Sequence, residues 1–141
     1  MRLKRDKHDK VFSDLVRCRS NYTCESCGKE CHGDLSMLDC SHYISRAHKR
    51  TRWHPDNAFA HCKSCHHKLG GNPGAFYQHY IEKRGIETEQ QVQSAAKRSW
   101  RATKDQKELL YRHYVNQLKI MHEMRRDGHI GWLDFDMLEV G

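Results

Sequence analysis

Four cysteines in two identical patterns are the first residues whose chemistry the sequence indicates. Cys24 and Cys27 are separated by two residues, and so are Cys62 and Cys65. Each pair can present two thiolates from one tight turn, and Gly28, directly after the first pair, suits the left-handed backbone that such turns need. Two such pairs are typical of a structural zinc site with four thiolate ligands. The sequence therefore predicts a structural Zn²⁺ ion at these four cysteines.

The remaining three cysteines are expected to lie outside this site. Cys31 and its neighbour His32 are close enough to the first pair to replace a ligand, although four thiolates already complete a tetrahedral site. Cys18 falls on a predicted helix and Cys40 on a predicted strand, and buried packing is expected for both.

A second group of residues between and beside the cysteine pairs is suited to proton transfer and metal binding. His42 lies on the strand predicted for residues 36–44, Asn57 on a loop, and His66 directly after Cys65, where a helix should begin. A histidine on a strand, an asparagine on a return loop and a histidine at the start of the next helix form the pattern of the HNH nucleases. This segment resembles that class, which has the ββα-metal fold.

The chain is similar to one group of these proteins in particular, the phage recombination nucleases called NinG or Rap. The resemblance extends from about residue 7 to about residue 120, which is most of the chain. Its matching elements are residues 9–17, Cys24, Cys27, residues 39–46 and 51–53, Asn57, residues 62–66, Gly71, Asn72, Tyr77, Ile81 and Gly85. It implies an α+β fold in which a short N-terminal helix and C-terminal helices flank a zinc-stapled ββα-metal (HNH) core.

The resemblance also implies a function, namely metal-dependent hydrolysis of DNA phosphodiester bonds by an endonuclease. His42 would accept a proton from the attacking water, since a neutral imidazole suits this role near pH 7. Asn57 would brace its loop and orient His42. A Mg²⁺ or Mn²⁺ ion held by Asp39 and His66 would stabilise the phosphate and the departing 3′ oxygen.

Two positions depart from the pattern of the family. Many HNH sites have an acid or a histidine directly before the base, where this chain has Ser41. Asp39 is expected to supply the carboxylate instead, because it points to the same face of the strand. The residue after Cys65 is often asparagine in the family and is His66 here, and His67 beside it is a second candidate for the same role.

Basic residues outnumber acidic ones, which suits a DNA partner. The chain has 25 Lys and Arg against 18 Asp and Glu, a net charge of +7. Such an excess attracts a polyanion, and each neutralised phosphate releases counterions. Residues 46–52 are especially basic, and Trp53 should pack their loop on the core. Phosphate contacts are expected from Arg46, His48, Lys49, Arg50, Arg52, Lys63 and Lys68. His48, His54 and His61 are further candidates to approach the metal or the DNA.

The elements around this site are expected to be helical. Apolar residues at helical spacing predict a short helix from residue 9 and a longer one over about 103–126. Between them, a helix should start near Pro73 and end at Gly85, and another should cover about 88–99 with Thr88 as its N-cap. The apolar stripe of the longest helix, at Leu110, Tyr114 and Leu118, is either core or the seam of a homodimer.

A single domain in four parts is expected: a basic N-terminal helix (1–23), the zinc-bound nuclease core (24–85), a helical extension (86–126) and an acidic tail (127–141). The tail could pack on the body, bind a partner or be disordered. No signal peptide or apolar run of membrane-spanning length is seen, which predicts a cytoplasmic location, in the host cell if the gene is phage-encoded, and no membrane partner.

The expected substrate is branched DNA such as a Holliday junction, because the resemblance implies a role in phage recombination. A symmetric junction is most simply cut by a symmetric dimer. Two alternatives remain: a general nicking or sequence-tolerant HNH endonuclease, and a non-catalytic zinc module that only binds DNA.

Overall fold

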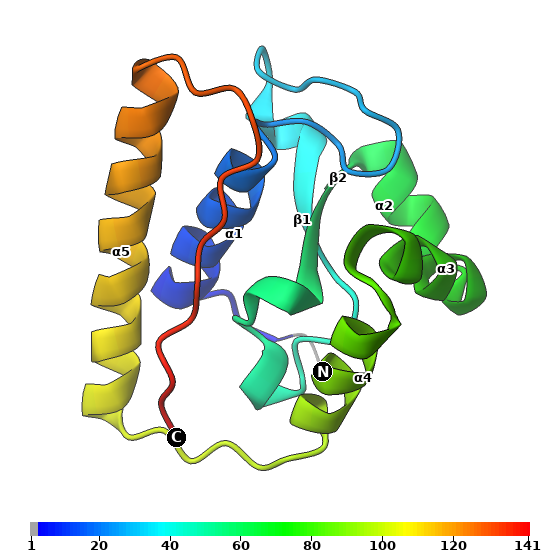
Figure 1. The fold of residues 1–141 in the computed structure, drawn as a ribbon. Helices are drawn as coiled ribbons and strands as arrows, with labels where there is room; N and C mark the ends of the chain where they lie inside the picture. The colour runs from blue at the N-terminus through cyan, green and yellow to red at the C-terminus, as the bar shows by residue number, and fades with distance from the viewer. Residues whose placement is uncertain (1–2) are drawn as a thin grey trace.

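A two-stranded antiparallel hairpin lies at the centre of the molecule, with helices on both of its faces (Figure 1). Its strands are β1 (Leu38–His42) and β2 (Ala58–Cys62), and Leu38 pairs with Cys62. This computed structural model describes residues 3–141. In them it forms that one sheet and five α-helices: α1 (Lys7–Arg19), α2 (Lys63–Gly70), α3 (Pro73–Arg84), α4 (Ile86–Ala96) and α5 (Lys104–Arg126). The expected mixed α+β class is therefore confirmed.

Helix α1 packs between the hairpin and α5 (Figure 1). It starts at a capping box, in which Asp6 and Asp9 each accept a hydrogen bond from the other's backbone N–H. Its apolar stripe, with Phe12 at the centre, is buried as its spacing predicted. Leu110 and Tyr114 of α5 are fully buried in the same core. The core alternative is thus correct for these two residues, and they are not free to form a dimer seam.

Capping residues and turns determine where the other helices and strands begin and end. Gly85, at a positive φ of 90°, ends α3 where predicted. Helix α4 begins at the very next residue, so Thr88 lies inside its first turn and the prediction that it is the N-cap is wrong. The strand predicted over 36–44 is shorter, because Asp34 caps a 3₁₀ turn over Leu35–Met37 that delays its start.

A second core fills the other face of the hairpin. It consists of Phe59 from β2, Phe76 and Tyr80 from α3, and Val92 from α4. Phe59 lies against both aromatic partners with ring centroids less than 6 Å apart. The hairpin is therefore held between two cores, and both of its faces are fixed.

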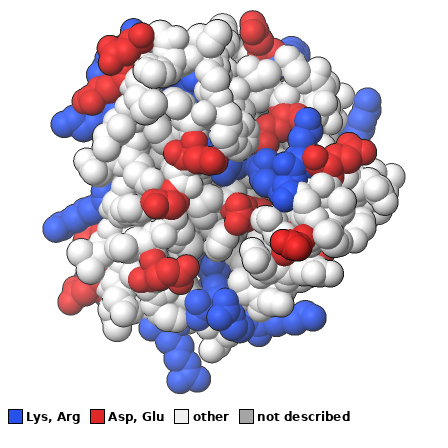
Figure 2. Space-filling view, in the orientation of Figure 1, with Lys and Arg blue, Asp and Glu red and all other residues white. Residues whose placement is uncertain are grey.

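The tail, residues 127–141, packs on the body. It returns beside α5 towards the start of that helix (Figure 1). Its Phe135 is 7% exposed and Leu133 donates its backbone N–H to Arg19. Acidic side chains are spread over the face that the tail crosses, whereas Lys and Arg gather along its lower edge (Figure 2). Within residues 3–141, no helix combines the length and apolar character needed to cross a membrane.

Candidate functional site

The four predicted zinc ligands come together in space. The Sγ atoms of Cys24, Cys27, Cys62 and Cys65 all lie within 4.8 Å of one another, and those of Cys27 and Cys62 are 3.7 Å apart. Four sulfurs at about 2.3 Å from a tetrahedral Zn²⁺ would be separated by about 3.8 Å. The residues present therefore fit a zinc ion. Cys31 is buried outside this group, so it is not needed as a replacement ligand.

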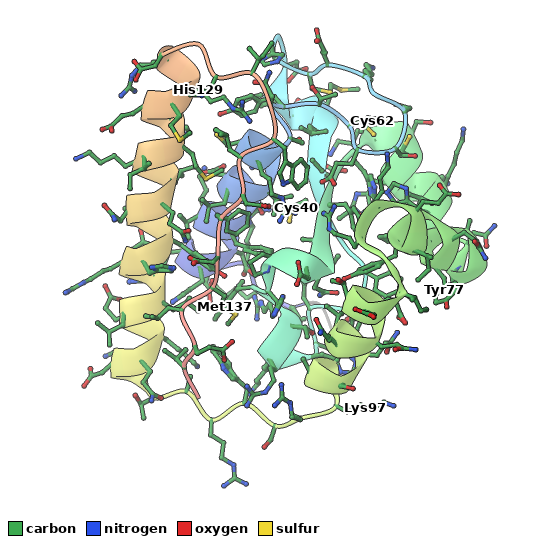
Figure 3. All side chains as sticks on the ribbon, viewed as in Figure 1. Cys40, Cys62, Tyr77, Lys97, His129 and Met137 are labelled. Carbon is green, nitrogen blue, oxygen red and sulfur yellow. The ribbon has the colours of Figure 1, made fainter. Side chains whose placement is uncertain are left out.

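The fold brings these thiols from three separate segments. Cys24 and Cys27 lie on the loop after α1, in a turn where Gly28 has a φ of +78°. Cys62 ends β2 and Cys65 lies in the first turn of α2, as Figure 3 shows for Cys62. A metal held here would join the loop, the end of the hairpin and the start of the helix.

His42 occupies the last position of β1, on the side that faces α1. Its Nε2 lies 2.8 Å from the carbonyl oxygen of Arg52. A carbonyl can only accept, so Nε2 carries the hydrogen and the lone pair of the neutral ring is on Nδ1. Burial lowers the pKa of His42 below its ordinary value. The imidazole is therefore a neutral proton acceptor near pH 7.

Asn57 is fully buried and holds the loop between the strands. Its amide group donates to the carbonyl oxygens of Ile44 at 2.9 Å and Thr51 at 3.0 Å, and its oxygen accepts from the backbone N–H of Ile44 at 2.8 Å. Thr51 directly precedes Arg52, whose carbonyl binds His42. Asn57 thus fixes His42 through the backbone of the loop and not through a hydrogen bond to the ring.

Asp39 contacts two side chains that start in α2. One carboxylate oxygen lies 2.8 Å from Nδ1 of His66 and the other lies 2.5 Å from the ammonium group of Lys63. Burial opposes ionisation of Asp39, but these two hydrogen bonds outweigh it and lower its pKa. With Nδ1 engaged, Nε2 of His66 is the nitrogen available to a ligand. Ser41 is fully buried, and its hydroxyl has no hydrogen-bond partner in the described residues.

His42 and His66 line one pocket of about 600 Å³ beside the start of α1. Its other lining residues are Leu3, Lys4, Arg5, Asp9, Ser13, Cys40 and Arg46. Three basic side chains face one carboxylate there, so the pocket favours an anion.

Cys40 packs against the main core, as expected, and its partly exposed side also lines the pocket. The alternation of β1 already placed it on the same face as His42.

The expected DNA-contact residues differ in how freely they face solvent. His48, Lys49 and Lys68 are exposed, and Lys63 is exposed but paired with Asp39. Arg46 is 30% exposed, lies at the pocket and comes within 3.8 Å of Asp9.

Arg52 and Arg50 are both engaged within the chain. Arg52 binds both carboxylate oxygens of Asp9, at 3.0 and 2.5 Å, and is 15% exposed. Arg50 donates to the carbonyl oxygens of Ser99 and Gly141. Both arginines therefore hold the loop against neighbouring segments.

The two other histidine candidates have structural partners. His61 is fully buried, its Nε2 lies 2.9 Å from Nε2 of His79, and burial followed by the charge of His79 lowers its pKa to about 3. His54 accepts a hydrogen bond from the backbone N–H of Asp56 and so caps a short turn. Trp53 is buried, as expected, and donates its indole N–H to Asp9.

Fold and site together define an α+β protein with a four-cysteine cluster that could hold zinc and, close to it, a cationic pocket that contains two histidines. The family model described as Bacteriophage Lambda NinG protein matches residues 3–124. The chain belongs to this family. No curated protein and no solved structure matches the chain significantly.

Proposed function

We propose that this protein is a metal-dependent DNA endonuclease of the HNH type. The observation that carries the proposal is the state of His42, a neutral base whose Nε2 is fixed by the Arg52 carbonyl, in a cationic pocket shared with His66. Phosphodiester hydrolysis requires a proton acceptor and charge compensation in one place, and this pocket offers both. Membership of a phage family supports the proposal.

In the proposed reaction, Nδ1 of His42 takes a proton from a water molecule whose oxygen attacks phosphorus. The bond from phosphorus to the 3′ oxygen breaks, and this oxygen takes a proton from solvent. Lys4, Arg5 and Arg46 hold the phosphate in the pocket by charge. Asn57 keeps the base in position through the loop described above.

Mg²⁺ or Mn²⁺ is the proposed catalytic ion, and it would supply stabilisation of the developing negative charge. His66 would hold it through Nε2. Asp39 accepts a hydrogen bond from the other nitrogen of that ring, an arrangement that orients metal-bound histidines in general. Asp39 would therefore mainly orient the His66 ring through this hydrogen bond, rather than bind the metal directly as expected from the sequence.

The proposed substrate is branched DNA such as a Holliday junction, cut in phage recombination, because the family resemblance implies it. A homodimer would suit a symmetric junction. Since Leu110 and Tyr114 are buried, such a dimer would use the outer face of α5, where Leu109 and Ile120 are about half exposed.

The test is cleavage of a four-way junction and of its matched linear duplex in Mg²⁺. Removal of the base in His42→Ala should lower the rate about 10²–10⁴-fold, with zinc content and circular dichroism unchanged. The control is His122→Ala, an exposed histidine of α5, which should cleave like the wild type. Undiminished cutting by His42→Ala would refute the assigned base. Equal rates on junction and duplex would refute the preference for branched DNA.

A further inference from the structure

The connection between α4 and α5 and the first residue of α5 carry basic side chains that do not line the His42 pocket. Lys97, Arg98, Arg101 and Lys104 are all exposed. Within the described part of the chain, none of the four forms an ion pair with a carboxylate, whereas Lys7, Lys10 and Lys63 each do. We call these four residues the linker surface. Their positive charges are uncompensated and face solvent.

The linker surface lies at one edge of the molecule. Basic side chains gather at the lower edge of Figure 2, over the α4–α5 connection, while most acidic side chains in that view lie above them. Figure 3 shows Lys97 at the end of α4, pointing away from the body. This separation produces a local positive field, although the whole chain has a net charge of only +7.

The linker is fixed to the loop that positions His42. The ring of Trp100 packs edge-on against Trp53 with centroids 5.6 Å apart, and its indole N–H donates to Val140. Arg50 donates to the carbonyl oxygen of Ser99 at 2.7 Å. Arg50 and Trp53 lie on either side of Arg52 in the sequence, so these contacts attach the linker backbone to the loop that positions His42. Cations on such a fixed backbone lose less conformational entropy when they bind.

The chemistry of the linker surface favours the sugar–phosphate backbone of DNA. In residues 97–104 no large apolar side chain is exposed, since Trp100 is turned towards Trp53. A membrane-binding segment would instead present apolar residues for insertion. Exposed Lys and Arg side chains contact phosphates without reading bases.

We propose that the linker surface is a second DNA-contact site, which binds the backbone of the same DNA whose scissile phosphate enters the His42 pocket. This inference rests on the proposed function, because it assumes that DNA is the substrate. In this proposal, residues 97–104 increase the affinity for DNA of any base sequence and take no part in phosphodiester hydrolysis.

The salt dependence of binding tests this inference. The variant Lys97→Gln/Arg98→Gln/Arg101→Gln is compared with Arg112→Gln/Lys119→Gln/Arg126→Gln, which removes the same charge from exposed positions of α5. Both are made in the His42→Ala background, so the DNA stays intact. Each lost phosphate contact lowers the slope of log K against log salt by about 0.9 on duplex DNA. The magnitude of this slope should fall by about two to three in the linker variant and by less than about one in the α5 variant.

Three results would overturn the inference. An unchanged slope in the linker variant would show that these residues do not touch phosphate, and equal losses in both variants would show that only net charge matters. The charge-preserving variant Lys97→Arg/Arg98→Lys/Arg101→Lys should keep the wild-type slope, and a loss there would refute the role of charge. Binding is measured without added Mg²⁺ or Mn²⁺, so the DNA stays intact even if His42 is not the base, and failure of the proposed catalytic function would not alter this result.

Discussion

Nε2 of His42 and the carbonyl oxygen of Arg52 form a hydrogen bond of 2.8 Å. The bond joins the end of β1 to the loop that Asn57 holds, and it decides which ring nitrogen carries the hydrogen. The reactivity of His42 therefore depends on the path of a backbone segment ten residues away in sequence.

Cleavage should depend on pH in a way that reports His42. Burial lowers its pKa below the ordinary 6.5, so the rate should fall with acid only below that pH. The charge of Arg46 also lowers this pKa. Arg46→Gln should therefore move the acid limb to higher pH. Single-turnover rates between pH 5 and 8 measure both effects, and a wild-type limb above 6.5 would contradict the assignment.

Asn57→Ala should reduce both stability and turnover. It leaves the buried carbonyl oxygen of Thr51 and the partly buried one of Ile44 without their partner, which costs about 1–3 kcal/mol in the free energy of unfolding. The rate of cleavage should fall while the Kd for DNA changes little. Gln90→Ala, at an exposed position of α4, is the control. A fully active Asn57→Ala protein would show that the loop does not position the base.

Asp9→Asn should weaken the attachment of α1 to the same loop. Asp9 is buried, and breaking its ion pair with Arg52 should cost about 3 kcal/mol in the free energy of unfolding. Burial opposes ionisation, but hydrogen bonds from Arg52 and Trp53 lower its pKa from 3.8 to about 2.

The stabilisation by Asp9 is present above pH 3.8 and is lost as the pH falls towards 2. Urea unfolding across this range should show the wild type and Asp9→Asn converging in acid. Asp6→Ala, which removes the N-cap of α1 and keeps the Asp9–Arg52 ion pair, should cost about 1 kcal/mol. Parallel curves for Asp9→Asn would refute the ion pair as the cause.

Phe135→Ala should show how strongly the tail is attached. The ring packs edge-on against Phe12 and Tyr114, with centroids 5.9 and 5.8 Å away. Removal of a buried phenylalanine side chain costs about 3–5 kcal/mol. Leu138→Ala, at a position 37% exposed in the same tail, should cost less than about 1 kcal/mol. Thermal unfolding of the two variants measures the difference, and equal small losses would mean that the tail is only loosely attached.

The sequence alone predicted those features of the fold and the site that depend on local contacts. Paired cysteines, helical spacing in α1 and α5, and Gly85 as a helix end all depend on residues within a few positions. The mutual approach of His42 and His66 followed from the resemblance to a known pattern, because the two residues are far apart in the chain.

Features that depend on contacts between residues far apart in the chain could not be predicted from the sequence. The ion pair of Arg52 could not be predicted, because its partner, Asp9, lies 43 residues away and on another element. The tail has no periodic pattern, since it packs through single residues such as Phe135. Thr88 satisfied a capping rule, but the positive φ of Gly85 allowed α4 to begin earlier.

The position of Cys65 next to His66 has a practical consequence for assays with chelators. An agent such as EDTA competes for any ion at the four thiolates as well as for one at His66, and loss of the first would release the start of α2. Inactivation by EDTA would then contain a fast step that added Mg²⁺ reverses and a slow step that it does not. The slow step should instead follow the release of zinc, which a colorimetric zinc indicator records in real time.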